Sequence, residues 1–222
     1  MLKVGLTGGI ACGKSVVGEM FVSLGAYLVQ ADRIAHDLML PGQPVYNEVV
    51  RHFGGGILNP DGSVNRAKLA EAAFGSPSSN ASDQPVAAES ASRRVEELNR
   101  IVHPAVIRSQ EEWMAETGRQ HPRATVIVEA ALILEAGAGK RFDRLIVVTC
   151  TDEQRVSRFA ARQKISLEAA RKEVTRRMAA QLPDAEKVKA ADFVIDNSGS
   201  LDQTREQVRK AWQLLRAEAA HR

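Results

Sequence analysis

Short apolar runs alternate with longer stretches of helical apolar spacing along this chain of 222 residues. A short apolar run without polar alternation is typical of a strand buried on both faces, as in a parallel sheet covered by helices. The pattern therefore predicts a three-layer α/β fold, with a five-stranded parallel sheet and helices on both of its faces. The runs are residues 2–7, 26–29, 124–129, 145–149 and 193–195.

The stretches between these runs carry apolar side chains at intervals that predict helices. In residues 201–219, Val208, Trp212 and Leu215 form a stripe that faces the core. Within residues 93–117, the pair His103-Pro104 predicts a break or a restart, because proline lacks the backbone N–H that a helix interior uses. The other predicted helices are residues 15–24, 33–39, 45–53 and 66–74.

Residues 33–123 contain predicted helices but no strand, although they lie between the second and third strands of the core. We expect an inserted helical part that covers a substrate. Inside it, residues 75–92 are rich in Gly, Ser and Pro and poor in apolar side chains, which predicts a mobile surface loop.

Residues 151–191 are also helical in pattern and are dense in arginine and lysine. Cationic helices suit a lid over a polyanion, because phosphoryl transfer depends on positioning and charge neutralisation. We expect one domain with this lid, the insertion, and a core of about residues 1–32, 124–150 and 192–222.

Residues 8–15 read Gly-Gly-Ile-Ala-Cys-Gly-Lys-Ser and match the phosphate-binding loop G-x-x-x-x-G-K-[ST]. The flexible backbone at Gly8 and Gly13 lets successive N–H groups point at one anion. Lys14 brings positive charge to the β- and γ-phosphates, and Ser15 offers a hydroxyl to Mg²⁺.

The context supports this motif, because a predicted strand leads into the loop and a predicted helix follows it. A strand-to-helix turn that uses glycine for geometry alone would explain the glycines but not Lys14-Ser15. We therefore predict a P-loop fold that binds ATP or GTP. The expected contacts are Gly8, Gly9, Ala11, Cys12, Gly13, Lys14, Ser15 and Val16.

The composition limits the partners. Hydrophobic residues make up 44% of the chain, enough for a sizeable core, and the net charge of +3 suits a small polyanion rather than nucleic acid. Cys12 and Cys150 have neither a metal-ligand nor a redox spacing, which favours a reducing compartment. No signal peptide or membrane-spanning run is apparent. We expect a cytoplasmic protein without a nucleic-acid, membrane or obligatory protein partner.

A phosphate loop alone does not identify an enzyme class. The guanine-reading sequence Asn-Lys-x-Asp of GTPases does not occur, and motor ATPases are usually longer. A helical insertion and a cationic lid favour a small-molecule kinase that uses ATP and Mg²⁺. The alternatives are a kinase of a nucleoside or another small alcohol, and a regulatory module that binds a nucleotide without transferring its phosphate.

Asp32 follows the second predicted strand, at the edge of a parallel sheet where ligands bind, and we expect it beside the end of the first strand. It is either a base that accepts or orients the proton of an attacking hydroxyl, or a cap of a helix that begins at Arg33. Glu129 ends the third strand and either contacts a metal through water, holds side chains of the phosphate loop, or is structural.

Four further side chains are candidates for ligand contacts or reactivity. Arg158 and Arg162 are four residues apart on one predicted helix, so they are expected to act on the same phosphate. Cys12 lies within the loop, where we interpret it as a small loop side chain rather than a reactive thiol. His103 is interpreted as structural, with a substrate contact as the alternative.

Taken together, these residues resemble the dephospho-coenzyme A kinase family over nearly the whole chain. The most particular runs are Leu-Asn-Arg-Ile-Val-His-Pro at residues 98–104 and Ala-Asp-Phe-Val-Ile-Asp-Asn-Ser-Gly at residues 191–199. The other matching elements are residues 6–15, 31–35 and 132–135, with Arg158 and Arg162 ahead of Gln181.

The resemblance implies that ATP donates its γ-phosphoryl group to the ribose 3′-hydroxyl of dephospho-coenzyme A. It implies that Asp32 is the base or orients the hydroxyl, that Lys14 and Arg158 serve catalysis, and that the insertion binds the coenzyme. It also implies substrate contacts at Thr7 and His103, and nucleotide contacts at Arg162 and Asn197.

The chain departs from the family pattern at three positions. Gln30 replaces a frequent acidic residue, Val16 replaces a threonine, and Ala131 replaces a proline. With Gln30 the chain lacks an acidic side chain that could help to bind the metal. With Val16 it lacks a hydroxyl that could bind the α-phosphate.

Overall fold

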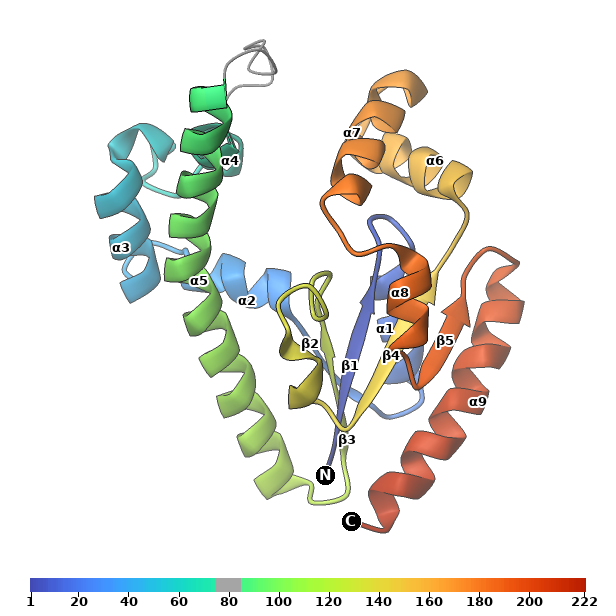
Figure 1. Cartoon of the computed structure of the whole chain (residues 1–222). Helices are drawn as coiled ribbons and strands as arrows, with labels where there is room; N and C mark the ends of the chain where they lie inside the picture. Colours follow the sequence, from blue (N-terminus) through green and yellow to red (C-terminus); the bar gives the residue numbers. More distant parts are fainter. Residues whose placement is uncertain (75–84) are drawn as a thin grey trace. The chain divides into compact units, whose positions relative to one another are not determined.

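The computed structural model of the chain describes residues 1–74 and 85–222, with side chains outside residues 74–92. Its five parallel strands lie in the order β2-β3-β1-β4-β5, which confirms the predicted five-stranded parallel sheet (Figure 1). The strands are β1 Leu2–Gly8, β2 Tyr27–Gln30, β3 Thr125–Glu129, β4 Arg144–Thr149 and β5 Phe193–Asp196.

The strand order corrects one expectation. The end of the second strand does not lie beside the end of the first, because β3 separates β1 from β2. Every residue of β3 is buried, whereas none of β2 is, and Tyr27 exposes 37% of its surface. A strand that is apolar on both faces is best placed in the interior of the sheet, which leaves β2 at its edge.

Helices α1 (Lys14–Ser23) and α9 (Leu201–Ala220) cover one face of the sheet. Phe21 and Leu215 from these helices share a core with Leu2, Val4 and Leu6 of β1. Successive strand residues point to opposite faces, so every second residue of β3 and β4 packs on the other face of the sheet. The second face is covered by Trp113 and Met114 of α5 (Pro85–Gln120) and by the segment after β3; the buried strand residues there are Val126, Val128, Leu145 and Val147. The chain thus has the three predicted layers.

The segment between β4 and β5 forms α6 (Asp152–Gln163), α7 (Leu167–Ala179) and α8 (Asp184–Lys189). Helix α6 begins with a capping box made by Thr151 and Gln154, and Lys164 ends it in a left-handed conformation. Phe159 and Val174 form a small core between α6 and α7, and Ile10 of the phosphate loop packs into that core. The cationic helices are therefore attached to the loop by apolar contacts.

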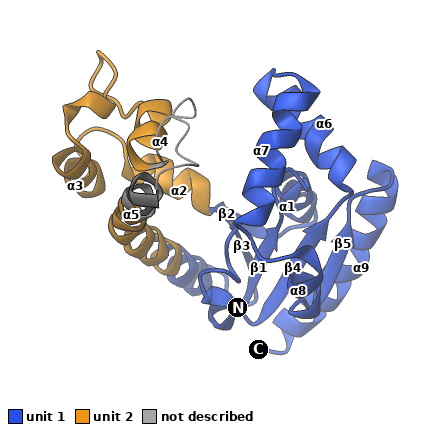
Figure 2. Cartoon of the chain, turned by 45° about the horizontal axis from the view of Figure 1, so that its top comes forward, with its two compact units in different colours: residues 1–30, 113–222 blue, residues 31–112 orange. Residues whose placement is uncertain are grey.

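The chain divides into two compact units, residues 1–30 with 113–222 and residues 31–112 (Figure 2). The second unit has its own core, which includes Val45, Val49 and Val106. It ends at Glu112, eleven residues before the end of the predicted insertion, since Trp113 and Met114 pack against β3. Its helices are α2 (Ala31–Leu38), α3 (Pro44–Phe53), the short η1 (Gly55–Ile57), α4 (Arg66–Phe74) and the first part of α5.

Helix α5 differs from the prediction at two places. It begins at Pro85, because proline is favoured in a first turn, and it continues through Pro104, where a break was expected. Val102 and Val106 on either side of Pro104 are buried in the core of the second unit, and this packing holds the helix together. Of the predicted mobile loop, residues 75–84 lie outside the described residues, whereas residues 85–92 are helical.

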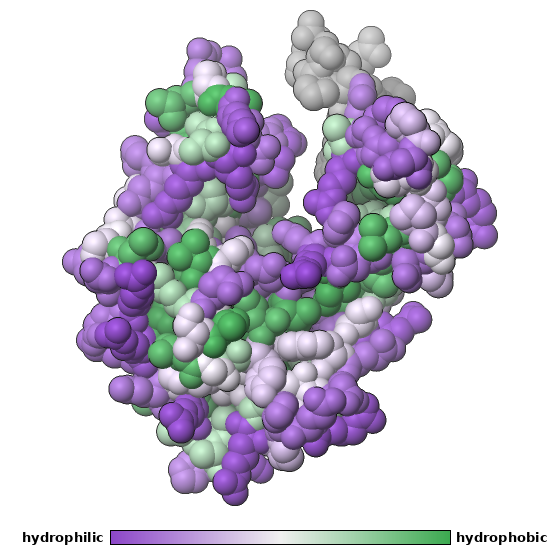
Figure 3. All heavy atoms as spheres, turned by 180° about the vertical axis from the view of Figure 1, so that it is seen from behind, coloured by the Kyte–Doolittle hydropathy of each residue, from purple (hydrophilic) through white to green (hydrophobic). Residues whose placement is uncertain are grey.

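In the described parts of the chain, no helix combines the length and the apolar character needed to cross a bilayer. Hydrophilic side chains occupy much of the face shown in Figure 3, with hydrophobic ones between them. Single exposed apolar side chains such as Leu167 and Leu214 are common on globular proteins and need no partner.

Candidate active site

The phosphate loop connects β1 to α1, and its two predicted glycine requirements are met. Gly8 and Gly13 have φ angles of 149° and 96°, in the region that favours glycine. A Cβ atom at Gly8 would overlap the backbone oxygen of Val148, and one at Gly13 would overlap the side chain of Asn197. Ala11 also has a positive φ, of 54°, so this loop places an alanine in a left-handed conformation.

Gly13 caps α1 without any side-chain hydrogen bond. The first N–H groups of the helix therefore have no side-chain partner, which is the arrangement that binds an anion at a helix N-terminus. Lys14 bends back over its own loop, with Nζ at 3.0 Å from the oxygen of Gly8 and 3.1 Å from that of Gly9. An ammonium group has three N–H donors, so one still points away from these carbonyls.

A chain of hydrogen bonds joins three side chains beside the loop. The Ser15 hydroxyl donates to Oε1 of Glu129 at 2.7 Å, and the Gln30 amide donates to Oε2 of the same carboxylate at 2.9 Å. Glu129 is buried, with 8% of its surface exposed, whereas Ser15 is exposed. Of the roles open to Glu129, the structure favours the one in which it holds a side chain of the phosphate loop.

The donors near the loop fit Mg²⁺. The Ser15 hydroxyl donates its hydrogen bond to Glu129, so the lone pairs of the Ser15 oxygen are available to a cation. Within residues 1–74 and 85–222, no three His, Cys, Asp or Glu side chains form a metal-binding group. Mg²⁺ suits this setting because it usually binds one or two protein oxygens together with substrate phosphates and water.

Arg158 and Asn197 lie against the backbone of the loop. Arg158 donates to the oxygens of Cys12 (3.3 Å) and Asn197 (2.9 Å), and the Asn197 amide donates to the same Cys12 oxygen at 2.9 Å. Thr204 of α9 completes the network by donating to the Asn197 side-chain oxygen at 3.0 Å. Arg162 is instead exposed and lies over the Phe159 ring, 5.6 Å from its centroid. The structure therefore does not bring Arg158 and Arg162 to one point.

Arg155 was not singled out from the sequence, although it lies one helical turn from Arg158. It is fully buried, pairs with Asp184 of α8, and donates to the oxygen of Ile10 at 3.1 Å. A side chain at Gly9 would overlap its guanidinium. Arg155 thus supports the loop from the α6 side, and its spacing from Arg158 is the only sequence signal for that role.

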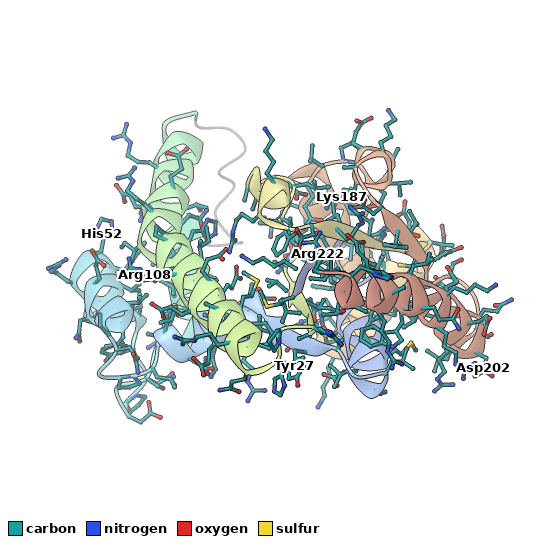
Figure 4. The ribbon with its side chains drawn as sticks, turned by 90° about the horizontal axis from the view of Figure 1, so that it is seen from below. Tyr27, His52, Arg108, Lys187, Asp202 and Arg222 are labelled. Carbon is teal, nitrogen blue, oxygen red and sulfur yellow. The ribbon has the colours of Figure 1, made fainter. Side chains whose placement is uncertain are left out.

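A second buried ion pair also went unnoticed. Lys187, labelled in Figure 4, is fully buried and its Nζ lies 2.8 Å from Oε1 of Glu135. The same oxygen accepts a hydrogen bond of 3.0 Å from the backbone N–H of Leu182. These contacts fasten α8 to the segment that follows β3.

The remaining candidates occupy three different settings. Thr7 is buried and its hydroxyl donates to the oxygen of Ala131 at 3.1 Å. Asp32 and His103 are exposed residues of the second unit, on α2 and α5. Helix α2 begins at Ala31, so Asp32 lies in the first turn, and the alternative that it caps a helix starting at Arg33 is wrong.

Neither cysteine is fully open to solvent. Cys12 is fully buried, in agreement with its interpretation as a small loop side chain. Burial raises the pKa of the Cys150 thiol, which disfavours the nucleophilic thiolate.

Comparisons with known proteins agree with this geometry. A family profile described as dephospho-CoA kinase matches residues 2–203. The chain is 38% identical to a dephospho-CoA kinase of Aquifex aeolicus, over 97% of this chain and 98% of the relative. It is 40% identical to one of Symbiobacterium thermophilum, over 96% of this chain and 80% of that relative.

Two solved structures share the fold over nearly the full length. One is a crystal structure of a Thermus thermophilus protein, with a TM-score of 0.75, 29% identity and 96% of each chain covered. The other is dephospho-CoA kinase from Campylobacter jejuni, with a TM-score of 0.66, 26% identity, and 97% of this chain and 98% of that one covered. The chain belongs to the dephospho-CoA kinase family.

Proposed function

We propose that this chain transfers the γ-phosphoryl group of ATP to the ribose 3′-hydroxyl of dephospho-coenzyme A, giving coenzyme A and ADP. The observation that carries the proposal is a phosphate loop with the required backbone geometry in a member of this kinase family. The enzyme is proposed to act in the cytoplasm.

The loop binds the triphosphate of ATP through the N–H groups of Gly9, Ala11, Cys12, Gly13 and Val16, and through Lys14. Arg158 serves catalysis as the lid arginine beside the phosphates, and it also supports the loop backbone, since its two donors engage the oxygens of Cys12 and Asn197. Arg162 has an exposed guanidinium and reaches the phosphates from the lid, and closure of the lid excludes water.

Ser15 holds Mg²⁺, with Glu129 behind its hydroxyl. When bound, Mg²⁺ neutralises charge on the β- and γ-phosphate oxygens and so favours transfer. The carboxylate of Glu129 is already occupied by Ser15 and Gln30, so its proposed role is to orient the hydroxyl.

Asp32 accepts the proton of the 3′-hydroxyl while the hydroxyl oxygen forms a bond to the γ-phosphorus and the bond between that phosphorus and the β,γ-bridging oxygen breaks. Asp32 follows the end of β2 by two residues, and its carboxylate is exposed. The helical part of residues 33–123, including His103, binds the rest of dephospho-coenzyme A.

The experiment is to incubate the protein with Mg-ATP and dephospho-coenzyme A and to separate the products by chromatography. Equal amounts of coenzyme A and ADP are expected. No dephospho-coenzyme A phosphorylated at a position other than the 3′-hydroxyl is expected. Omitting dephospho-coenzyme A controls for ATP hydrolysis. Failure to form coenzyme A, with phosphorylation of a nucleoside instead, would overturn the proposal in favour of another small-molecule kinase.

A further inference from the structure

We propose that Gln30 is a positioning residue of the metal site: its amide fixes the Glu129 carboxylate, which orients the Ser15 hydroxyl so that the oxygen faces a divalent cation. The inference rests on the proposed function, because it assumes that Ser15 binds the cation of Mg-ATP. It adds a residue that touches neither nucleotide nor metal.

The sheet itself brings Gln30 to Glu129. These two residues are register partners at the last positions of β2 and β3, and Leu6 of β1 is the register partner of Glu129 on its other side. Neighbouring residues in register project to the same face of a parallel sheet. The contact is therefore built into the strand pairing and does not depend on a flexible surface side chain.

The carboxylate of Glu129 is held at both of its oxygens. Oε1 accepts from Ser15 at 2.7 Å and Oε2 accepts from Gln30 at 2.9 Å. Only 8% of Glu129 is exposed, so water is a poor substitute for a lost donor. Removal of the Gln30 amide would leave Oε2 without this partner and release the carboxylate to turn.

The orientation of Glu129 determines which side of the Ser15 oxygen is available. A hydroxyl has one hydrogen and two acceptor lone pairs, and it rotates to suit its surroundings. When the hydrogen points to Glu129, the lone pairs point away from it, which is the arrangement that a hard cation requires. A freely turning carboxylate would lose this control, so the cation would be bound less tightly.

The inference predicts an effect that depends on Mg²⁺. The test variants are Gln30→Met, which keeps the length of the side chain, and Gln30→Ala. Both replacements are neutral, so the charge of the site is unchanged and only the amide donor is lost. The matched control is Gln120→Leu, because the Gln120 amide also donates to a glutamate, Glu116, but on the exposed C-terminal turn of α5.

ATP affinity is measured by titration calorimetry in excess Mg²⁺ and in EDTA. Loss of a hydrogen bond to a charged group should reduce the gain in affinity that Mg²⁺ confers by about tenfold in both Gln30 variants. Affinity in EDTA should stay within about twofold of the wild type, and Gln120→Leu should match the wild type in both conditions.

An equal loss of affinity in Mg²⁺ and in EDTA would show that Gln30 only supports the loop, and no loss in either would show that it has no role; each result overturns the inference. Should Gln30→Met fail to fold, Gln30→Ala decides between these outcomes. Formation of coenzyme A by the wild type is assayed separately. If the Mg²⁺ effect is seen without coenzyme A formation, the proposed function fails and the positioning role stands.

Discussion

The side-chain amide of Asn197 donates a hydrogen bond of 2.9 Å to the backbone oxygen of Cys12 and so joins the end of β5 to the phosphate loop. Asn197 is itself held by Thr204 of α9, and both residues are buried. The loop is thereby fixed to a rigid part of the core, which pre-organises its N–H groups for an anion.

We expect Asn197→Asp to weaken ATP binding by about tenfold and to lower Tm by about 5 °C, because a buried carboxylate oxygen would replace the donor facing the Cys12 oxygen. Titration calorimetry and thermal unfolding followed by circular dichroism measure the two effects. Asn59→Asp is the control, since Asn59 belongs to the second unit and its amide bonds Ser63. Unaltered ATP affinity in Asn197→Asp would contradict the role of this contact.

The ion pair between buried Arg155 and half-buried Asp184 should behave as a coupled unit. Arg155→Met should lower the free energy of unfolding by about 3 kcal/mol and Asp184→Asn by about 1–2 kcal/mol, the second less because Asp184 is partly exposed. The double variant should lose less than the sum, by about 1 kcal/mol. Urea denaturation measures the cycle.

Asp152→Asn is the control for this cycle. Asp152 lies 3.4 Å from Nε of Arg155, but its side chain is 65% exposed, so the variant should cost no more than about 0.5 kcal/mol. Additive losses in the Arg155 and Asp184 variants would mean that the pair is not coupled.

Replacement of Asp32 by asparagine should abolish the proposed base and keep the size of the side chain. We expect kcat to fall by at least about 100-fold with ATP affinity within about twofold of the wild type. Single-turnover kinetics and calorimetry separate the two quantities. Asp37→Asn provides the comparison, because Asp37 is an exposed carboxylate on the same helix. Retention of full kcat in Asp32→Asn would remove Asp32 from the chemical step.

Glu173 of α7 should make part of the protein's folding stability depend on pH in the acidic range. Hydrogen bonds from Arg176 and then Arg177 lower the pKa of its carboxyl from 4.5 to about 2. A carboxyl whose pKa is lower in the folded than in the unfolded chain stabilises the fold at pH values above its unfolded pKa. This contribution is therefore complete near neutral pH and is lost as the pH falls from about 4.5 to about 2.

Glu173→Gln should therefore lower Tm by about 2 °C at neutral pH, with the difference from the wild type shrinking steadily below about pH 4.5. Thermal unfolding across this range measures it. Glu168→Gln removes an exposed pair with Lys172 from the same helix and should have little effect. A difference that stays constant down to about pH 2 would show that Glu173 acts by packing.

Much of the fold follows from local patterns. The phosphate loop is predictable because its glycines stand at fixed spacing in one short segment, where Gly8 and Gly13 adopt backbone angles that favour glycine. Continuous apolar runs identify the strands, since a parallel sheet buries both of its faces. The helix break predicted at Pro104 is wrong because tertiary packing overrides the local pattern. Burial of Val102 and Val106 outweighs the local cost of proline.

The amino-acid sequence by itself determined the phosphate loop, the five strands and the family to which they belong. Only the tertiary structure decided that β3 lies between β1 and β2, and that Arg155 is buried against the phosphate loop. It also decided that Ser15, Gln30 and Glu129 meet, although Glu129 is 114 and 99 positions away from the other two. Such contacts depend on strand order and on packing between distant segments, which no local pattern of residues encodes.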